Sequence, residues 1–133
     1  MSSEWNVVSS YSRAQAIEDG VLVDVSEVSK QVFTYPVALT AAVYAQLVEW
    51  PKARSAERKC YQDESARLWD VIWMAYCAVN CSARDTDRIW FEVLAIDPSP
   101  GEPTTPHTHR LISHVGPGDD AEPVITIMLP EES

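Results

Sequence analysis

Apolar residues recur at helical spacing in the first half of the chain and alternate with polar residues in the second half. Over residues 63–80, Trp69, Ile72, Trp73 and Tyr76 stand at i, i+3, i+4 and i+7, which predicts one face of an α-helix. A second apolar stripe runs beside the first. We therefore expect a helix that is buried on several sides, with its tryptophans in the core.

Two further helices are predicted before this one. Residues 36–50 are alanine-rich and apolar on most sides, and Pro36 suits the first turn of a helix. A shorter helix is predicted over residues 13–19. Ser12 stands at its N-cap and Gly20 just past its end, where these residue types are favoured.

Strand-like segments dominate the last third of the chain, where branched and aromatic residues alternate with polar ones. The predicted strands lie at residues 88–96, 109–115 and 123–129. The brief apolar run at 21–23 fits either a short strand or an extended link. The order of elements predicts an α+β domain over residues 1–133, with the long helices 36–50 and 63–80 packed on a three-stranded antiparallel sheet.

The charge is strongly acidic and unevenly distributed. Twenty acidic residues against ten basic ones give the 133-residue chain a formal net charge of −10. This charge argues against direct binding of nucleic acid, which needs a basic surface, and favours a basic protein partner. Beyond residue 85 only Arg88 and Arg110 are basic, so we expect an acidic face there. Its candidate partner-binding residues are Asp97, Glu102, Asp119, Asp120, Glu122, Glu131 and Glu132, with Trp5 or Trp90 as an aromatic anchor.

Cysteine usage and the N-terminus bear on location. Three cysteines, an odd number, argue against a disulfide framework. The N-terminal residues lack the positive and apolar regions of a secretory signal, and no apolar run is long enough to span a membrane. We expect a cytoplasmic protein that has no membrane partner.

One set of metal-ligating residues is worth weighing. Cys77 and Cys81 stand at i, i+4 on the 63–80 helix, and His107 and His109 lie near a strand. Two thiolates and two imidazoles would satisfy tetrahedral zinc, but the spacing differs from the usual zinc unit, and cysteine in a buried helix is common as packing. We therefore expect no metal and no other cofactor. No residue is assigned a catalytic role, because no oriented nucleophile–base pair can be identified.

Four segments together resemble a domain family of unknown function whose members are small proteins of bacteria, plasmids and phages. They are YSRAQAIEDGVLVDVSE, YPVALTAAVYAQLVEW, DESARLWDVIWMA and GPGDDAEPVITIMLPEE. The resemblance implies a mobile-element accessory protein, and no activity comes with it. Small acidic proteins of such elements often inhibit host defence, as anti-CRISPR and antirestriction proteins do.

Charge and resemblance together favour a non-enzymatic inhibitor that binds the basic surface of a nucleic-acid-handling defence complex in a bacterial host. Two alternatives remain open at this point. One is a small enzyme or zinc-binding module built on the cysteines and histidines above. The other is a structural module that forms a homodimer through exposed tryptophans.

Overall fold

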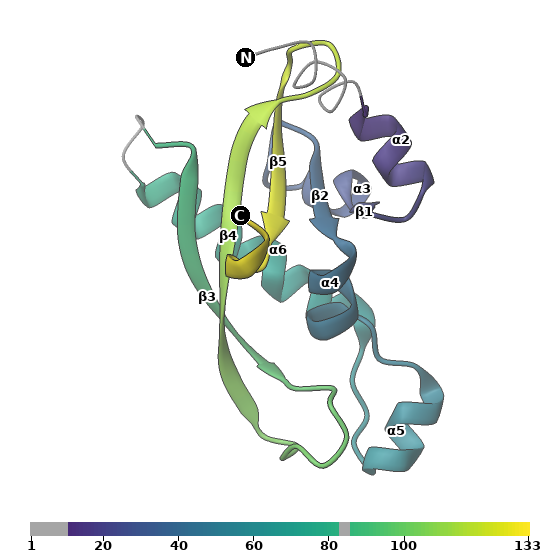
Figure 1. The fold of residues 1–133 in the computed structure, drawn as a ribbon. Helices are drawn as coiled ribbons and strands as arrows, with labels where there is room; N and C mark the ends of the chain where they lie inside the picture. Colours follow the sequence, from purple (N-terminus) through teal and green to yellow (C-terminus); the bar gives the residue numbers. More distant parts are fainter. Residues whose placement is uncertain (1–10, 83–85) are drawn as a thin grey trace.

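The computed structural model describes residues 11–82 and 86–133, which form a mixed sheet flanked by helices (Figure 1). In chain order the elements are α2 (Arg13–Glu18), β1 (Leu22–Asp24), α3 (Ser26–Ser29), β2 (Val37–Thr40), α4 (Ala41–Val43), the π-helical turn η1 (Tyr44–Val48), α5 (Lys52–Arg58), α6 (Glu64–Cys81), β3 (Arg88–Ile96), β4 (Pro106–Pro117), β5 (Pro123–Met128) and the 3-10 turn η2 (Pro130–Glu132).

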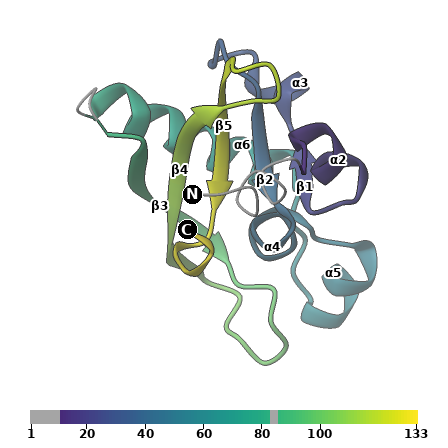
Figure 2. The ribbon, with the colours of Figure 1, turned by 45° about the horizontal axis from the view of Figure 1, so that its top comes forward.

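The five strands of this sheet lie in the order β1–β2–β5–β4–β3, as Figure 2 shows with β3 at one edge. Strands β3, β4 and β5 form an antiparallel meander, with Phe91 opposite Leu111 and Ser113 opposite Ile127. Strand β2 runs parallel to β5, and β1 pairs antiparallel with β2 at the other edge.

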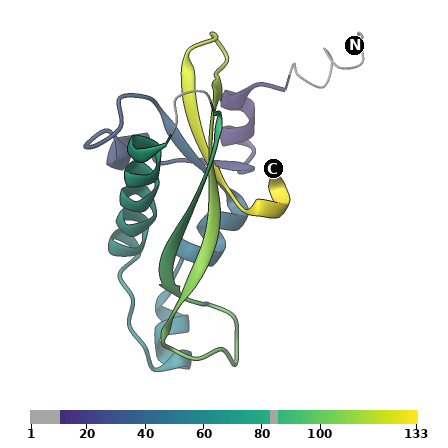
Figure 3. The ribbon, with the colours of Figure 1, turned by 90° about the vertical axis from the view of Figure 1, so that its left-hand side faces the viewer.

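Helix α6 covers one face of the sheet, whereas α2 and η2 lie on the other (Figure 3). The helix buries Val71, Ile72 and Ala75 against an inner sheet face that includes Leu39 and Ile127. On the opposite face, the Arg13 guanidinium at the start of α2 donates to the hydroxyl of Thr126 at 2.7 Å and to the carbonyl of Ile125 at 2.8 Å. The sheet is thus covered on both faces near β2 and β5, and β3 is its least covered strand on the outer face.

The α+β class agrees with the sequence-based prediction, but the predicted architecture is wrong. Instead of two long helices on three antiparallel strands, one long helix packs on a mixed sheet of five strands. The run at 21–23 falls largely within a strand, β1, and strand β4 is longer than the predicted 109–115.

The error at residues 36–50 has a clear physical cause. Val37, Ala38 and Leu39 are completely buried in β2, between β1 and β5. A strand buried on both faces is a continuous apolar run, which periodicity alone does not separate from a buried helix. Helical structure begins only after Thr40, whose hydroxyl accepts the Val43 N–H at 3.3 Å as an N-cap.

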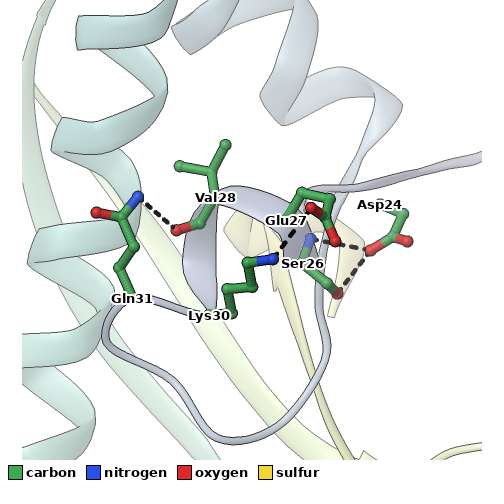
Figure 4. A network of polar contacts seen from close by, with 6 residues as sticks. All are labelled: Asp24, Ser26, Glu27, Val28, Lys30 and Gln31. Carbon is green, nitrogen blue, oxygen red and sulfur yellow. Dashed lines mark hydrogen bonds and ion pairs between the residues drawn. The ribbon is translucent and has the colours of Figure 1, made fainter.

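The short helix α3 is fixed by polar contacts at the end of β1 (Figure 4). Asp24 Oδ1 accepts hydrogen bonds from the Ser26 N–H at 3.0 Å and hydroxyl at 2.7 Å, and Lys30 pairs with Glu27 at 3.1 Å. The Ser26 hydroxyl also accepts the Val37 N–H at 3.1 Å, which joins α3 to the start of β2. None of the helices in the described residues combines the length and apolar character needed to cross a membrane.

Candidate functional site

A groove of about 450 Å³ lies between α6 and the edge strand β3, and we call it the β3 groove. It is lined by Asp70, Trp73, Met74, Glu92, Val93, Leu94 and Thr108. A smaller recess of about 170 Å³ shares Asp70, Val93 and Leu94 with it and extends to Gln62 and Pro106. The two hollows therefore lie next to each other along the seam between helix and strand.

The helix side of the β3 groove presents aromatic surface that is held in place. Trp73 stacks on Trp69 with ring centroids 6.2 Å apart and lies 5.5 Å from Tyr76, which meets the buried Phe33 edge-on at 5.6 Å. Trp73 is nevertheless 43% exposed and its neighbour Met74 is 40% exposed. The prediction that the tryptophans of this helix lie in the core is therefore wrong for Trp73, because α6 is apolar around most of its circumference and only one side faces the sheet.

Strand β3 places apolar side chains on the outer face of the sheet as well. Phe91 and Val93 point into the core, whereas Trp90 and Leu94 alternate with them and are 50% and 64% exposed. The Arg110 guanidinium of β4 lies over the Trp90 ring, 4.5 Å from its centroid. Large apolar side chains thus flank the β3 edge on both of its sides.

Arg67 fixes the floor of the recess at the start of α6. This buried guanidinium donates to the carbonyl oxygens of Val48 at 3.2 Å and Ile96 at 3.3 Å, and lies 4.9 Å from the ring centroid of Trp50. Burial lowers the pKa of Arg67, with a smaller contribution in the same direction from the positive charge of Arg54. The side chain ties helix, π-helical turn and strand together and so holds the seam on which the groove depends.

The acidic residues of the expected partner-binding face lie in separate places. Asp119, Asp120 and Glu122 belong to the β4–β5 turn, at the opposite end of the molecule from the β3–β4 loop that holds Asp97 and Glu102, and η2, with Glu131 and Glu132, lies between them (Figure 1). The structure therefore does not gather these seven carboxylates into one patch, and their part in partner binding stays a prediction.

Several of these carboxylates have structural bonds. The Asp119 oxygens accept the N–H groups of Arg13 at 2.7 Å and Ala14 at 3.0 Å, and these bonds lower the pKa of Asp119. Asp97 accepts the Ser99 N–H at 2.8 Å, which likewise lowers the pKa of Asp97.

Two more of these carboxylates, Glu122 and Glu132, are bonded within their own turns or across to β2. Glu122 accepts the Asp120 N–H at 2.9 Å, and Glu132 Oε1 accepts the Thr40 hydroxyl at 2.7 Å and the Leu129 N–H at 2.9 Å. In these cases one oxygen of the carboxylate already has a protein partner.

The predicted zinc ligands and aromatic anchors are also placed apart. Cys77 and Cys81 lie toward the C-terminal end of α6, whereas His107 and His109 pair with Ala95 and Val93 near the end of β3. The described residues contain no group of three or more His, Cys, Asp or Glu side chains that could hold a metal ion. Of the two proposed anchors, Trp90 stands at the exposed β3 edge, and Trp5 lies outside the described residues.

Sequence reasoning named Trp90 as a possible anchor but missed the residues that line the groove, although one signal was visible. Trp90 and Leu94 share the strand face that alternation assigns to solvent, and two large apolar residues on that face indicate a surface with a function. The helix side of the groove carried no such signal, since Trp73 and Met74 fit an ordinary buried stripe.

Comparison with known proteins adds a family but no activity. The model of a family of unknown function, DUF6573, matches residues 2–133. Neither the curated proteins nor the solved structures contain a match to the chain.

Proposed function

The chain belongs to this family of unknown function, and we propose that it acts without catalysis, by binding another protein at the β3 groove. The observation that supports this proposal is the exposure of Trp73, Met74, Trp90 and Leu94, each at least 40% exposed, around one edge strand. Three of them, Trp73, Met74 and Leu94, line one groove, and exposed apolar surface gathered in this way often marks an interaction site. Aromatic residues and methionine are also the types enriched in protein–protein interfaces.

The row of stacked rings along α6 supports the same proposal. Because Trp73 is held by Trp69 and Tyr76, it loses little conformational freedom when a partner covers it. A preorganised aromatic surface lowers the entropic cost of association.

The finer proposal concerns the partner and its setting. We propose a basic surface on a nucleic-acid-handling defence complex, with the chain serving a phage, plasmid or other mobile element in the bacterial cytoplasm as an inhibitor of anti-CRISPR or antirestriction type. Its support is the formal net charge of −10, which favours rapid association with a basic protein and disfavours nucleic acid itself.

Photo-crosslinking from single positions tests protein binding at this site. A benzophenone amino acid replaces Met74 in the groove or, as the matched control, exposed Gln31 in the turn after α3, and each protein is produced in the cells from which the chain comes. We expect a discrete crosslinked species from Met74 that Leu94→Glu removes, and none from Gln31. Equal crosslinking from both positions, or none from Met74, would contradict binding at the groove.

The inhibitor proposal has its own test. Bacteria that carry a restriction or CRISPR system are challenged with phage while producing the wild-type chain or the Leu94→Glu variant. We expect the wild type to raise phage plating and the variant to lose that effect; plating that the wild type leaves unchanged across the defence types would count against an inhibitor.

A further inference from the structure

We propose that the β3 edge takes up an extended, basic and apolar segment of the partner as a sixth strand of the sheet. This inference rests on the proposed protein-binding function and adds to it the chemistry of the partner and the geometry of docking. It depends on three features: the orientation of the edge backbone, the apolar groove beside it, and the charge of the groove lining.

The backbone of β3 faces outward at alternate residues. Residues 88–96 pair with β4 without a break, and among the described residues no strand lies beyond β3. In an antiparallel ladder, residues that bond the neighbouring strand alternate with residues that face away from it. The Val115 N–H donates to the Asp87 carbonyl at 2.9 Å, so Asp87 faces β4. The residues that face away in the middle of the strand are then Trp90, Glu92 and Leu94.

Two contacts further along the strand agree with this alternation. The Ile96 carbonyl, which belongs to the outward set, accepts a hydrogen bond from Arg67 on α6 at 3.3 Å. Ala95 belongs to the inward set, and its carbonyl lies 3.1 Å from Nε2 of His109 on β4. Arg67 therefore closes the far end of the edge, and the stretch from Trp90 to Leu94 presents N–H and C=O groups that can pair with an added strand.

The groove gives such a strand places for its side chains. Side chains of an added strand alternate between the two faces of the sheet. One set would lie over Trp73 and Met74 on the α6 side, and the other over Trp90 and Leu94 on the outer face. Apolar residues of the incoming segment therefore meet apolar surface on both sides of the edge.

The charge of the lining selects a cationic segment. Asp70 and Glu92 line the β3 groove, and none of its seven lining residues is Lys, Arg or His. Three guanidinium groups lie nearby but outside this lining: Arg67 donates to carbonyl oxygens, Arg110 stands opposite Glu92 and over the Trp90 ring, and Arg88 stands at the start of β3. A lysine or arginine of the added strand that enters the groove would meet two carboxylates and no cation among the lining residues, which favours it there over a neutral or acidic residue.

The same charges disfavour a second copy of the chain as the occupant. A two-fold antiparallel pairing centred on the middle of β3 would place Glu92 directly opposite Glu92, and like charges in such a pair are destabilising. Each copy would also bring a formal net charge of −10 to the contact.

Synthetic peptides test the charge selection. The probes are a short peptide that alternates lysine with valine and its glutamate–valine counterpart, and binding to the full chain is measured by fluorescence anisotropy. We expect the lysine peptide to bind and the glutamate peptide not to. Glu92→Lys should weaken the lysine peptide about tenfold, whereas Glu18→Lys, the same charge change on α2, should leave it unchanged. Equal affinity for both peptides, or equal effects of the two substitutions, would overturn the proposal.

Backbone methylation of the lysine peptide tests strand pairing itself. Two versions carry N-methyl groups on alternate residues, one version for each edge of the extended peptide. A strand added to β3 uses only one of its edges, so we expect one version to bind like the parent and the other to lose binding. If both methylated versions bind like the parent peptide, or if neither binds, strand addition is contradicted.

The outcomes separate this inference from the function on which it rests. Crosslinking from Met74 without peptide binding would overturn strand addition while protein binding stands; no crosslink from Met74 would overturn protein binding as well. Sedimentation of the purified chain tests whether a second copy of the chain occupies the β3 edge. A dimer that Leu94→Glu dissociates would assign the edge to self-association and refute the proposal.

Discussion

Replacing Arg67 with methionine tests how the seam between α6, the π-helical turn and β3 is held. Methionine keeps an apolar stem but removes the donors that reach the buried Val48 and Ile96 carbonyls. Each of these two acceptors costs about 1–3 kcal/mol when it loses its partner, about 2–6 kcal/mol for both, and the loss of the guanidinium from the Trp50 ring adds about 0.5–2 kcal/mol. Relief from burying the charge offsets part of this sum, so we expect the free energy of unfolding to fall by about 3–5 kcal/mol.

Urea unfolding followed by far-UV circular dichroism measures this change without relying on tryptophan emission. Arg88→Met is the matched control, because Arg88 is exposed on β3, and we expect it to change the free energy of unfolding by less than about 0.5 kcal/mol. The loss for Arg67→Lys should lie between those of Arg67→Met and Arg88→Met, since lysine keeps the charge but not the planar guanidinium. A loss below about 1 kcal/mol for Arg67→Met would refute the reasoning that these buried bonds stabilise the fold.

Three further predictions concern stability. The pKa of Asp119 is lower in the folded chain than in the unfolded chain, so the ionised carboxylate stabilises the fold above the unfolded pKa, and this stabilisation is lost as pH falls through the folded pKa. Asp119→Asn should therefore flatten the fall of Tm in acid, and Asp120→Asn, its neighbour in the same turn, should not. The Ser113 hydroxyl is buried without a hydrogen-bond partner among the described residues, so Ser113→Ala should raise the free energy of unfolding by about 1 kcal/mol, and a fall in urea titration would contradict this. Because Trp50 is only 4% exposed, Trp50→Ala should lower the free energy of unfolding by about 3–5 kcal/mol, and Trp73→Ala should lower it clearly less. Thermal unfolding of both variants checks this ranking.

Local sequence patterns predicted the elements that depend on local chemistry. The Ser12 hydroxyl accepts the Gln15 N–H at 2.9 Å, as an N-cap should, and Gly20 has the positive φ of 80° that suits glycine beyond a helix end. The alternation over residues 88–96 gave the bounds of β3, because a strand with one face in the core separates apolar and polar residues along the chain.

The candidate site was much harder to predict from the sequence. Trp73 and Leu94 belong to different elements. Neither the helical spacing around Trp73 nor the alternation around Leu94 predicts that the two side chains line one groove. By its position Arg67 is a polar residue in the first turns of a helix, whereas in the structure it is buried and donates to three backbone carbonyls far away along the chain. Such contacts depend on how elements pack, which local spacing does not encode.

By itself, the sequence determined the acidic charge, the long helix, the meander of β3, β4 and β5, and membership of a family recognisable from its segments. Only the tertiary structure decided that residues 37–40 form a central strand, because a fully buried strand and a buried helix are both apolar throughout. It also decided that Trp73 of α6 stays partly exposed beside β3 and that β3 stands at the edge. The packing of the whole chain decides which side of an apolar helix is covered. It also decides which strand has no neighbour on one side.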